Sequence, residues 1–249
     1  MYIRKFKNKL RNHIWTFLKA KWKLRSELEI IIENDSDWFV FNEIFANKEY
    51  DKALSHLMKD MPQRPLVLDL GANVGYFTLK IADELIQAGV TDFEIIALEA
   101  SPFNYKTLAR RFDQKLLKGK AKAVLGLAGY KTGSHTILHS QQHYGHSAVL
   151  DRHSANEIAI DYIDIEKLLN NTSGKIDFLK CDIEGSEEIF IREYLPLLQK
   201  VEHAVFEFHA GECDVVKCHK LLEGTGLRSR GIIKEDANFK TSVEIFSRH

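Results

Sequence analysis

The stretch "VLDLGANVGYFTLKIA", residues 67–82, joins a short apolar run to a helix-like pattern through two glycines. The apolar run at 66–70 is typical of a buried strand, and the spacing over 76–88 is typical of a helix. Gly71 and Gly75 flank the turn, where the missing Cβ lets backbone N–H groups approach a ligand. The stretch therefore predicts the first strand, loop and helix of an α/β nucleotide-type domain.

This loop differs from two familiar phosphate-binding loops. Asn73 occupies the place of the second glycine in the dinucleotide pattern G-x-G-x-x-G, and no G-K-[ST] follows. Asp69 adds a carboxylate one residue before the strand ends, which suits a cationic or hydroxyl-bearing ligand better than a pyrophosphate. An NAD-dependent oxidoreductase is the alternative interpretation, but it should carry the second glycine.

Strand-like and helix-like segments alternate along the rest of the chain. The strand-like runs are 94–100, 121–129, 176–183 and 203–209, and the helical patterns between them include 102–112 and 187–199. Such alternation predicts a mostly parallel sheet with helices on both faces. The segment 227–248 has the pattern of a closing β-hairpin. We therefore expect one α/β domain over residues 63–249.

Residues 1–62 are predicted to form an N-terminal helical extension. Residues 27–60 have helix-like spacing with many aromatic residues, and residues 1–25 carry nine Lys/Arg and no acid among apolar residues. We interpret 1–25 as a basic amphipathic helix. It either makes peripheral contact with an anionic membrane surface or packs its apolar stripe on the domain.

Composition limits the classes of partner and compartment. The 249 residues contain 35 Lys+Arg and 35 Asp+Glu, so net charge gives no reason to expect nucleic acid as a partner. The three cysteines lack C-x-x-C spacing, which favours reduced thiols in a cytoplasmic protein. No run approaches the roughly 18 apolar residues that a membrane-spanning helix needs.

Glu99 ends the second predicted strand, 24 residues after Gly75. In α/β nucleotide sites an acid at this position accepts hydrogen bonds from ribose hydroxyls. Glu99 and the glycine loop together predict a nucleoside-containing cofactor.

Four motifs, in this order and spacing, carry a family resemblance: "VLDLGANVGYFTLKIA", "IIALEASPFNYKTLARRF", "IDFLKCDIEGSEEIFI" and "HAVFEFH". They resemble the FkbM family of S-adenosylmethionine-dependent methyltransferases over about residues 64–248. The resemblance implies a Rossmann-like class I methyltransferase fold, with a seven-stranded, mostly parallel sheet and an antiparallel C-terminal hairpin. It also implies methyl transfer to a hydroxyl of a sugar, glycan or related metabolite. A non-catalytic binding module with the same fold is a further alternative.

The resemblance also assigns cofactor residues. It implies that Asp69, Gly71, Asn73 and Gly75 hold the methionine part of S-adenosylmethionine. Glu99, followed by Ala100, would hold the ribose, and Asp182 is a further candidate for the cationic methionine end. Residues 127–129 would lie near the adenine, where "LAGYKTG" departs from the usual family form.

Four proton-accepting groups are expected at one rim of the sheet. Asp182 and Glu184 end the fourth strand, and Glu207 and His209 end the fifth. Within each pair the residues are two apart, so both side chains face the same way if the strand persists. We expect His209 to be the general base because of its pKa range, with Asp182 next and Glu207 and Glu184 as further candidates.

Other acids near this rim are expected to have structural roles. Glu184 is an alternative cap for the following helix, and Glu187 and Glu188 are expected only to favour its first turn.

Two arrangements of side chains could hold a metal ion, but neither is predicted to do so. Asp182, Glu207 and His209 offer ligands for a magnesium-like or manganese-like ion, but no H-E-x-x-H or cysteine-rich signature supports one. The segment 131–161 is rich in histidine, but its glycines favour strands and a loop that would scatter these side chains. We expect this segment to shape the acceptor pocket, with contacts from Tyr144, His146 and Ser147. Its histidines are His135, His139, His143, His146 and His153.

Overall fold

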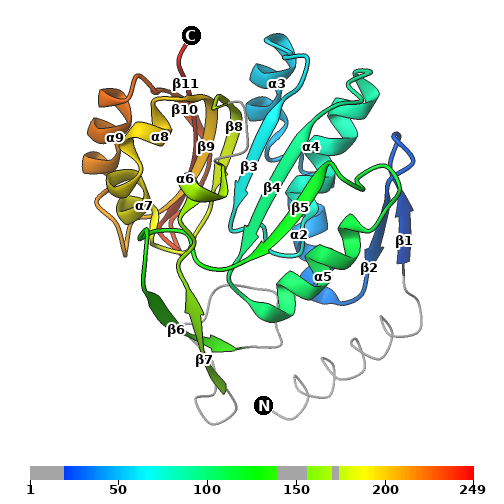
Figure 1. The fold of residues 1–249 in the computed structure, drawn as a ribbon, viewed down its shortest axis with the longest axis horizontal. Coiled ribbons are helices and arrows are strands. Elements are labelled where there is room, and N and C mark those ends of the chain that lie inside the picture. Colours follow the sequence, from blue (N-terminus) through cyan, green and yellow to red (C-terminus); the bar gives the residue numbers. More distant parts are fainter. Residues whose placement is uncertain (1–19, 140–155, 170–173) are drawn as a thin grey trace.

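A computed structural model describes residues 20–139, 156–169 and 174–249 (Figure 1). Seven strands form the central sheet in the order β10-β11-β9-β8-β3-β4-β5. The five parallel strands are β3 (Leu66–Leu70), β4 (Glu94–Glu99), β5 (Ala121–Leu125), β8 (Ile176–Cys181) and β9 (Val201–His209). The hairpin β10 (Arg228–Asp236) and β11 (Thr241–Ser247) is antiparallel, so the predicted sheet and its closing hairpin are confirmed.

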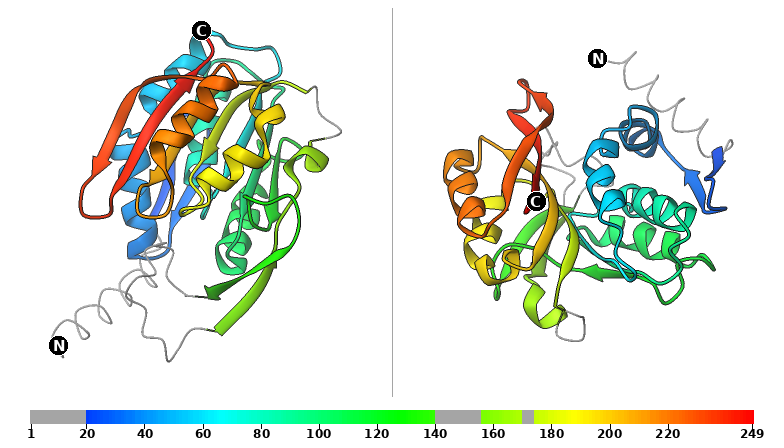
Figure 2. Two further views of the ribbon diagram at one scale, coloured as in Figure 1. Left: turned by 90° about the vertical axis from the view of Figure 1, so that its left-hand side faces the viewer. Right: turned by 90° about the horizontal axis from the view of Figure 1, so that it is seen from above.

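Helices cover both faces of this sheet (Figure 2). One face carries α3 (Asp51–Lys59), α4 (Tyr76–Gln87) and α5 (Pro102–Phe112), and the other carries α6 (Ile165–Leu168), α7 (Glu187–Glu193), α8 (Leu195–Leu198) and α9 (Val215–Gly224). Side chains alternate along β3, so Val67 enters one core while Leu66 and Leu68 enter the other. Burial on both faces explains the near-continuous apolar pattern of the parallel strands.

The chain order reverses at β3. From β3 the chain moves outward through β4 and β5, and then returns to add β8 and β9 on the opposite side. In open α/β sheets ligands bind beyond the carboxyl ends of the strands at such a switch point. The fold therefore predicts a ligand site at the carboxyl ends of β3, β4, β8 and β9.

The N-terminal extension departs from the all-helical prediction. β1 (Ala20–Lys23) and β2 (Glu29–Ile32) form an antiparallel hairpin, so the helix expected over 1–25 is wrong for residues 20–25. The reason is a period of two: Leu28, Ile30 and Ile32 are buried while Glu29 between them is exposed. Residues 1–19 lie outside the described part of the chain, so the membrane contact stays a prediction.

After the hairpin the extension is helical, as predicted. It comprises α2 (Asp35–Phe41), the π-helical turn η1 (Asn42–Ala46) and α3. Leu28, Ile30 and Phe41 share one hydrophobic core with Phe77 and Ile95 of the sheet domain. The extension is thus packed into the same core as the domain that follows it.

A buried arginine ties the extension to the glycine loop. Arg111 of α5 donates to the carbonyls of Val74 (2.7 Å) and Ile31 (2.9 Å), and it forms an ion pair with Asp37 (3.1 Å). Both charged side chains are buried. One guanidinium therefore joins the glycine loop, β2 and α2.

The histidine-rich segment contains strands, as expected, whereas the helix predicted over 187–199 is interrupted. β6 (Ser134–His139) and β7 (Asn156–Asp161) form a separate antiparallel pair inside the histidine-rich segment, with His135 and His139 both on β6. The helix predicted over 187–199 is divided at Tyr194, because Pro196 opens α8 and cannot donate a helical hydrogen bond. His143, Tyr144, His146, Ser147 and His153 lie outside the described residues.

The three cysteines are free and buried, as expected for reduced thiols. Among the described residues, no helix combines the length and the apolar character that crossing a membrane requires.

Candidate functional site

The glycine loop passes close to the end of β8. Gly71 has a φ of 75°, and a Cβ there would lie 1.6 Å from the carbonyl oxygen of Asp182. Gly75 has a φ of 90° and begins α4, and its Cβ would lie 2.6 Å from Leu108 Cδ1. Both positions therefore require glycine, for conformation and for space.

Glu99 lies against this loop, as the sequence predicted. Its two carboxylate oxygens accept the backbone N–H groups of Asn73 and Ser101, each at 2.8 Å. Asn73 has a φ of 51°, a left-handed conformation that asparagine tolerates better than most residues. Burial raises the pKa of Glu99 to about 7, against the opposing effect of these hydrogen bonds. Glu99 thus holds the loop to the turn that starts α5, and Ala100 lies half-buried in that turn.

Asp69 lies below the loop and is completely buried. It accepts the Thr78 hydroxyl at 2.7 Å and lies 3.6 Å from Lys180 Nζ. Asp69 does not line the pocket at the carboxyl ends of β8 and β9, and its side-chain contacts are with Thr78 and Lys180.

Lys180 is a functional candidate that the sequence reasoning missed. Its Nζ donates to the Gly71 carbonyl (2.9 Å) and to Asp182 Oδ2 (3.2 Å). Burial alone would lower the pKa of Lys180, but Asp182 and Asp69 outweigh burial and raise it. The signal in the sequence was a single lysine inside an otherwise apolar strand, "FLKC".

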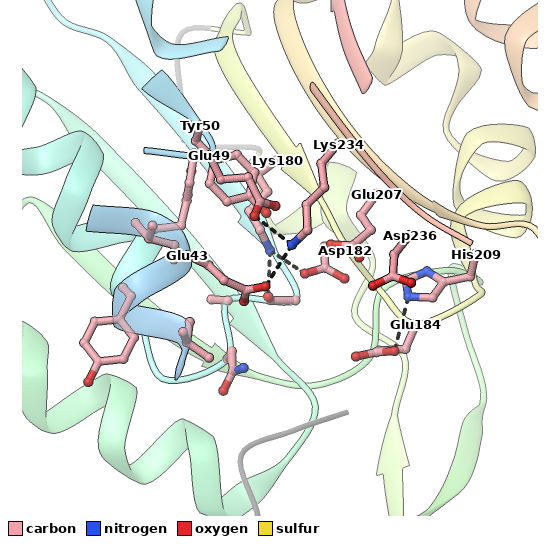
Figure 3. A pocket seen from close by; sticks show the side chains of 17 residues that line it. Glu43, Glu49, Tyr50, Lys180, Asp182, Glu184, Glu207, His209, Lys234 and Asp236 are labelled. Carbon is pink, nitrogen blue, oxygen red and sulfur yellow. Dashed lines mark hydrogen bonds and ion pairs between the residues drawn. The ribbon is translucent and has the colours of Figure 1, made fainter. Parts of the chain in front are cut away.

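A pocket lies at the carboxyl ends of β8 and β9, where Figure 3 shows its polar wall. It contains all four rim residues predicted from the sequence, together with residues of the glycine loop, the N-terminal extension and β10. Its lining residues include Glu43, Glu49, Tyr50, Gly71, Asn73, Tyr76, Phe77, Lys180, Asp182, Glu184, Glu207, His209, Lys234 and Asp236.

His209 ends β9 between two carboxylates. Its Nδ1 lies 3.2 Å from Glu187 Oε1, and its Nε2 lies 3.3 Å from Glu184 Oε2. Burial would lower the pKa of His209, but the hydrogen bonds to Glu184 and Glu187 raise it to about 11. Both ring nitrogens therefore carry protons at neutral pH, which weighs against the expectation that His209 is the general base.

Glu187 does more than favour a helix start. It is completely buried, and its Oε1 also accepts the backbone N–H groups of Ile183 (3.0 Å) and Gly185 (3.2 Å). Glu184, with a φ of 54°, directs its carboxylate toward His209, and α7 begins with no side-chain cap. Glu188 pairs with Lys217 at the surface, in keeping with its predicted structural role.

Glu207 precedes His209 by two residues and lines the same pocket. Burial and the nearby Asp182 raise the pKa of Glu207 to about 8. No hydrogen bond or ion pair joins its carboxylate to any other residue of the described ranges. The Glu207 carboxyl group is therefore partly ionised near neutral pH, and its oxygens are available to a ligand.

The opposite wall of the pocket comes from distant parts of the chain. Lys234 of β10 forms ion pairs with Glu43 of η1 and with Glu49, both at 2.8 Å. These contacts join the C-terminal hairpin to the N-terminal extension across the pocket (Figure 3). No local sequence pattern marks them, because the partners are separated by 185 and 191 residues.

A comparison with known protein families identifies the family of this chain. The sequence profile of the methyltransferase FkbM domain matches residues 69–217, which is more than half of the chain. The protein belongs to the FkbM methyltransferase family. The resemblance drawn from the four motifs is thereby confirmed, and the oxidoreductase alternative loses its support.

Individual relatives agree with this assignment of the FkbM protein. "Methyltransferase 1" of Beauveria bassiana is 24% identical over 213 residues, covering 76% of this chain and 80% of that protein. Methyltransferase sdnD of Sordaria araneosa is 35% identical over 72 residues, covering 29% of this chain and 24% of the relative.

A solved structure shares the fold. The crystal structure of an FkbM methyltransferase from Methylobacillus flagellatus superposes with a TM-score of 0.52 at 14% identity. The match covers 98% of this chain and 60% of that protein, so the present chain spans about three fifths of that protein's length.

The residues of this FkbM methyltransferase fit S-adenosylmethionine, the methyl donor of the family. Gly71 has no side chain, so the loop backbone lies directly beside the end of β8. Glu99 holds a carboxyl group against the loop. Asp182 adds a negative charge for the cationic end of the cofactor. When bound, the cofactor supplies a methyl group on a sulfonium sulfur. The individual contacts expected of Asp69, Asn73, Gly75 and Ala100 stay predictions.

Proposed function

We propose that this FkbM methyltransferase transfers the methyl group to a hydroxyl oxygen of a sugar, a glycan or a related metabolite. The observation that carries the proposal is Glu207. Its carboxylate faces the pocket with no hydrogen bond or ion pair to another described residue. A sugar hydroxyl is poorly acidic, so a base that removes its proton during attack accelerates the transfer.

Glu207 replaces His209 as the proposed base for a geometric reason. Both ring nitrogens of His209 contact carboxylates. The Glu207 oxygens form no hydrogen bond or ion pair with another described residue. Glu207 lies at the carboxyl end of β9, next to β8, which ends at the glycine loop. The base on β9 and the cofactor loop after β3 are thus separated by one strand, β8.

The composition of the pocket supports a polyhydroxylated acceptor. Carboxylates and lysines surround it, and these groups exchange hydrogen bonds with hydroxyls. Tyr50, Tyr76 and Phe77 contribute apolar atoms to the lining, and each is at most 5% exposed. A mixed wall of this kind can hold the acceptor in line with the methyl group, and such positioning supplies much of the rate enhancement.

The test is a transfer assay with deuterated-methyl S-adenosylmethionine. The purified chain is incubated with matched hydroxyl and amine acceptors, for example a monosaccharide, its amino-sugar analogue and a lipid-linked glycan. Mass spectrometry and NMR then locate the new methyl group. Transfer to oxygen supports the proposal, and transfer confined to nitrogen or carbon would overturn it. Cofactor binding without transfer to any acceptor would favour the non-catalytic binding module.

A further inference from the structure

We propose that Asp182, Glu184 and His209 form a binding site for a divalent metal ion of the manganese type. One ligand atom from each residue lies within 4.8 Å of the others, at one wall of the pocket (Figure 3). The set differs from the one that the sequence suggested, because Glu184 takes the place of Glu207. A left-handed backbone at Glu184 turns its carboxylate toward His209 after β8 has ended.

The separations agree with metal coordination. His209 Nε2 and Glu184 Oε2 are 3.3 Å apart. Transition metals bind nitrogen and oxygen at about 2.1 Å, so two ligands at octahedral to tetrahedral angles lie roughly 3.0–3.4 Å apart. A metal ion can therefore bridge these two atoms at a separation close to the present one. Asp182 offers a third ligand atom within 4.8 Å of the other two.

A second observation comes from the buried residue behind the histidine. The completely buried Glu187 contacts Nδ1 of His209, which leaves Nε2 facing Glu184 and the pocket. A histidine that binds a metal through one ring nitrogen usually donates a hydrogen bond from the N–H group of the other to such a carboxylate. Backbone N–H groups of Ile183 and Gly185 fix Glu187 in turn. Glu187 thus orients the ring of His209 without being one of the proposed metal ligands.

The charge of the pocket also favours a cation. Six carboxylates line it, and Lys180, Lys234 and His209 are its cationic side chains. Lys234 pairs with Glu43 and Glu49, and Lys180 is shared between Asp69 and Asp182. The six carboxylates are Glu43, Glu49, Asp182, Glu184, Glu207 and Asp236. An excess of negative charge therefore remains where β8 and β9 end, and a divalent ion would neutralise it.

The donor set indicates the kind of ion. One imidazole nitrogen and two carboxylates leave open positions for water or for the acceptor hydroxyl. A metal ion in contact with that hydroxyl would lower its pKa and assist loss of the proton to Glu207. This catalytic role rests on the proposed O-methylation, whereas binding of the ion does not.

The experiment measures Mn²⁺ binding to the full chain without cofactor or acceptor. Calorimetry and the electron paramagnetic resonance signal of free Mn²⁺ give the affinity, and pulsed resonance detects nitrogen coupling from a coordinated imidazole. We expect one bound ion with nitrogen coupling. Asp182→Asn and Glu184→Gln should each weaken binding at least about tenfold. His209→Gln should abolish the nitrogen coupling.

Two variants distinguish a specific metal site from nonspecific attraction of Mn²⁺ to the acidic pocket. Glu207→Gln removes a carboxylate of the same pocket that is outside the ligand set, so Mn²⁺ affinity should change less than about threefold. Glu187→Gln leaves all ligands in place and should weaken binding by about 10-fold or more, through misorientation of His209. Glu184 is half exposed, so its variant should fold even if Asp182→Asn does not.

Three outcomes would overturn the site: no bound Mn²⁺, binding without nitrogen coupling, or equal loss in Glu207→Gln and Glu184→Gln. Failure of the proposed function is distinguishable. Intact Mn²⁺ binding with transfer to nitrogen overturns only the O-methylation. Metal-independent transfer to oxygen by a chain that does not bind Mn²⁺ overturns only the metal site.

Discussion

The backbone at Gly71 and the carbonyl oxygen of Asp182 approach so closely that a Cβ on Gly71 would lie 1.6 Å from that oxygen. The Asp182 N–H group donates to the Leu70 carbonyl at 3.1 Å, and the Gly71 N–H group donates to the Leu98 carbonyl at 2.9 Å. The cofactor loop and the acidic rim are thus joined by main-chain atoms. Three central strands, β3, β4 and β8, meet at this one point.

Replacing Gly71 by alanine should therefore disrupt the site and the fold together. The Gly89→Ala variant is a matched control, because Gly89 has a φ of 82° but a methyl group added there would have nothing within 4 Å. We expect Gly89→Ala to cost about 1–2 kcal/mol from backbone strain, and Gly71→Ala to cost several kcal/mol more or to prevent folding. Chemical denaturation measures both, and similar losses in the two variants would contradict the overlap at Asp182.

The Glu207→Gln variant tests the proposed base. The glutamine side chain cannot accept a proton from the acceptor hydroxyl, so kcat should fall by roughly 10²–10⁴ while binding of S-adenosylhomocysteine stays within about threefold. Glu202→Gln, at the opposite end of the same strand β9, is the control and should retain activity. Unchanged turnover in Glu207→Gln would remove this residue from the mechanism.

Cofactor affinity should depend on pH through Glu99. Burial raises the pKa of its carboxyl group to about 7. Ribose hydroxyls donate to the ionised form, so affinity for S-adenosylhomocysteine should rise as the pH increases from about 6 to about 8. Calorimetric titration across this range measures the trend. The affinity should be independent of pH in Glu99→Gln. It should keep its pH dependence in Glu94→Gln, which alters the start of the same strand.

The same ionisation should affect stability without cofactor, with the opposite sign. Because the folded pKa of Glu99 is raised, the stabilisation by its proton is present at low pH and is lost as the pH rises through about 7. Denaturation curves from about pH 5 to about pH 8 should therefore show a decline that Glu99→Gln reduces. A decline of equal slope in that variant would assign the effect to another group.

Arg111 should be essential for the contact between the extension and the glycine loop. Arg111→Met removes the ion pair between Arg111 and the buried Asp37, and we expect a loss of about 3–5 kcal/mol in unfolding free energy together with weaker cofactor binding. The neighbouring Arg110 forms an exposed ion pair with Glu33, so Arg110→Met should cost less than about 1 kcal/mol. Equal losses in the two variants would contradict a special role for the buried pair.

The basic N-terminal segment is proposed to contact anionic lipid, and the described part of the extension supports a sharper test. Trp22 is 55% exposed, and Lys21 and Lys23 beside it are also exposed. The chain should sediment with phosphatidylserine vesicles but not with neutral ones, and deletion of residues 1–19 or Trp22→Ala should reduce this. Phe239→Ala, an exposed aromatic at the β10–β11 turn, is the control.

Deletion of residues 1–19 also tests the competing interpretation. If the segment packs its apolar stripe on the domain, the truncated chain should be less stable in a denaturation experiment, and vesicle binding should be absent in both forms.

The local features of the site could be read from the sequence because short-range physics fixes them. Two glycines at a strand end, an acid at the end of the next strand and alternating apolar runs reflect the geometry of single elements and of neighbouring strands. The loop around Gly71, the position of Glu99 and the closing hairpin were therefore predictable. The hairpin over 20–32 was missed because a short segment with period two lay within a longer pattern that favoured helix.

The chemistry of the rim depended on contacts between distant residues. The ring of His209 has an ordinary pKa range in isolation, but Glu184 and Glu187 surround it in the folded chain and change its role. The wall made by Lys234, Glu43 and Glu49 joins the two ends of the chain, which no local pattern encodes. Protonation state and pocket shape follow from burial and from neighbouring charges, and these exist only once the sheet has brought the strand ends together.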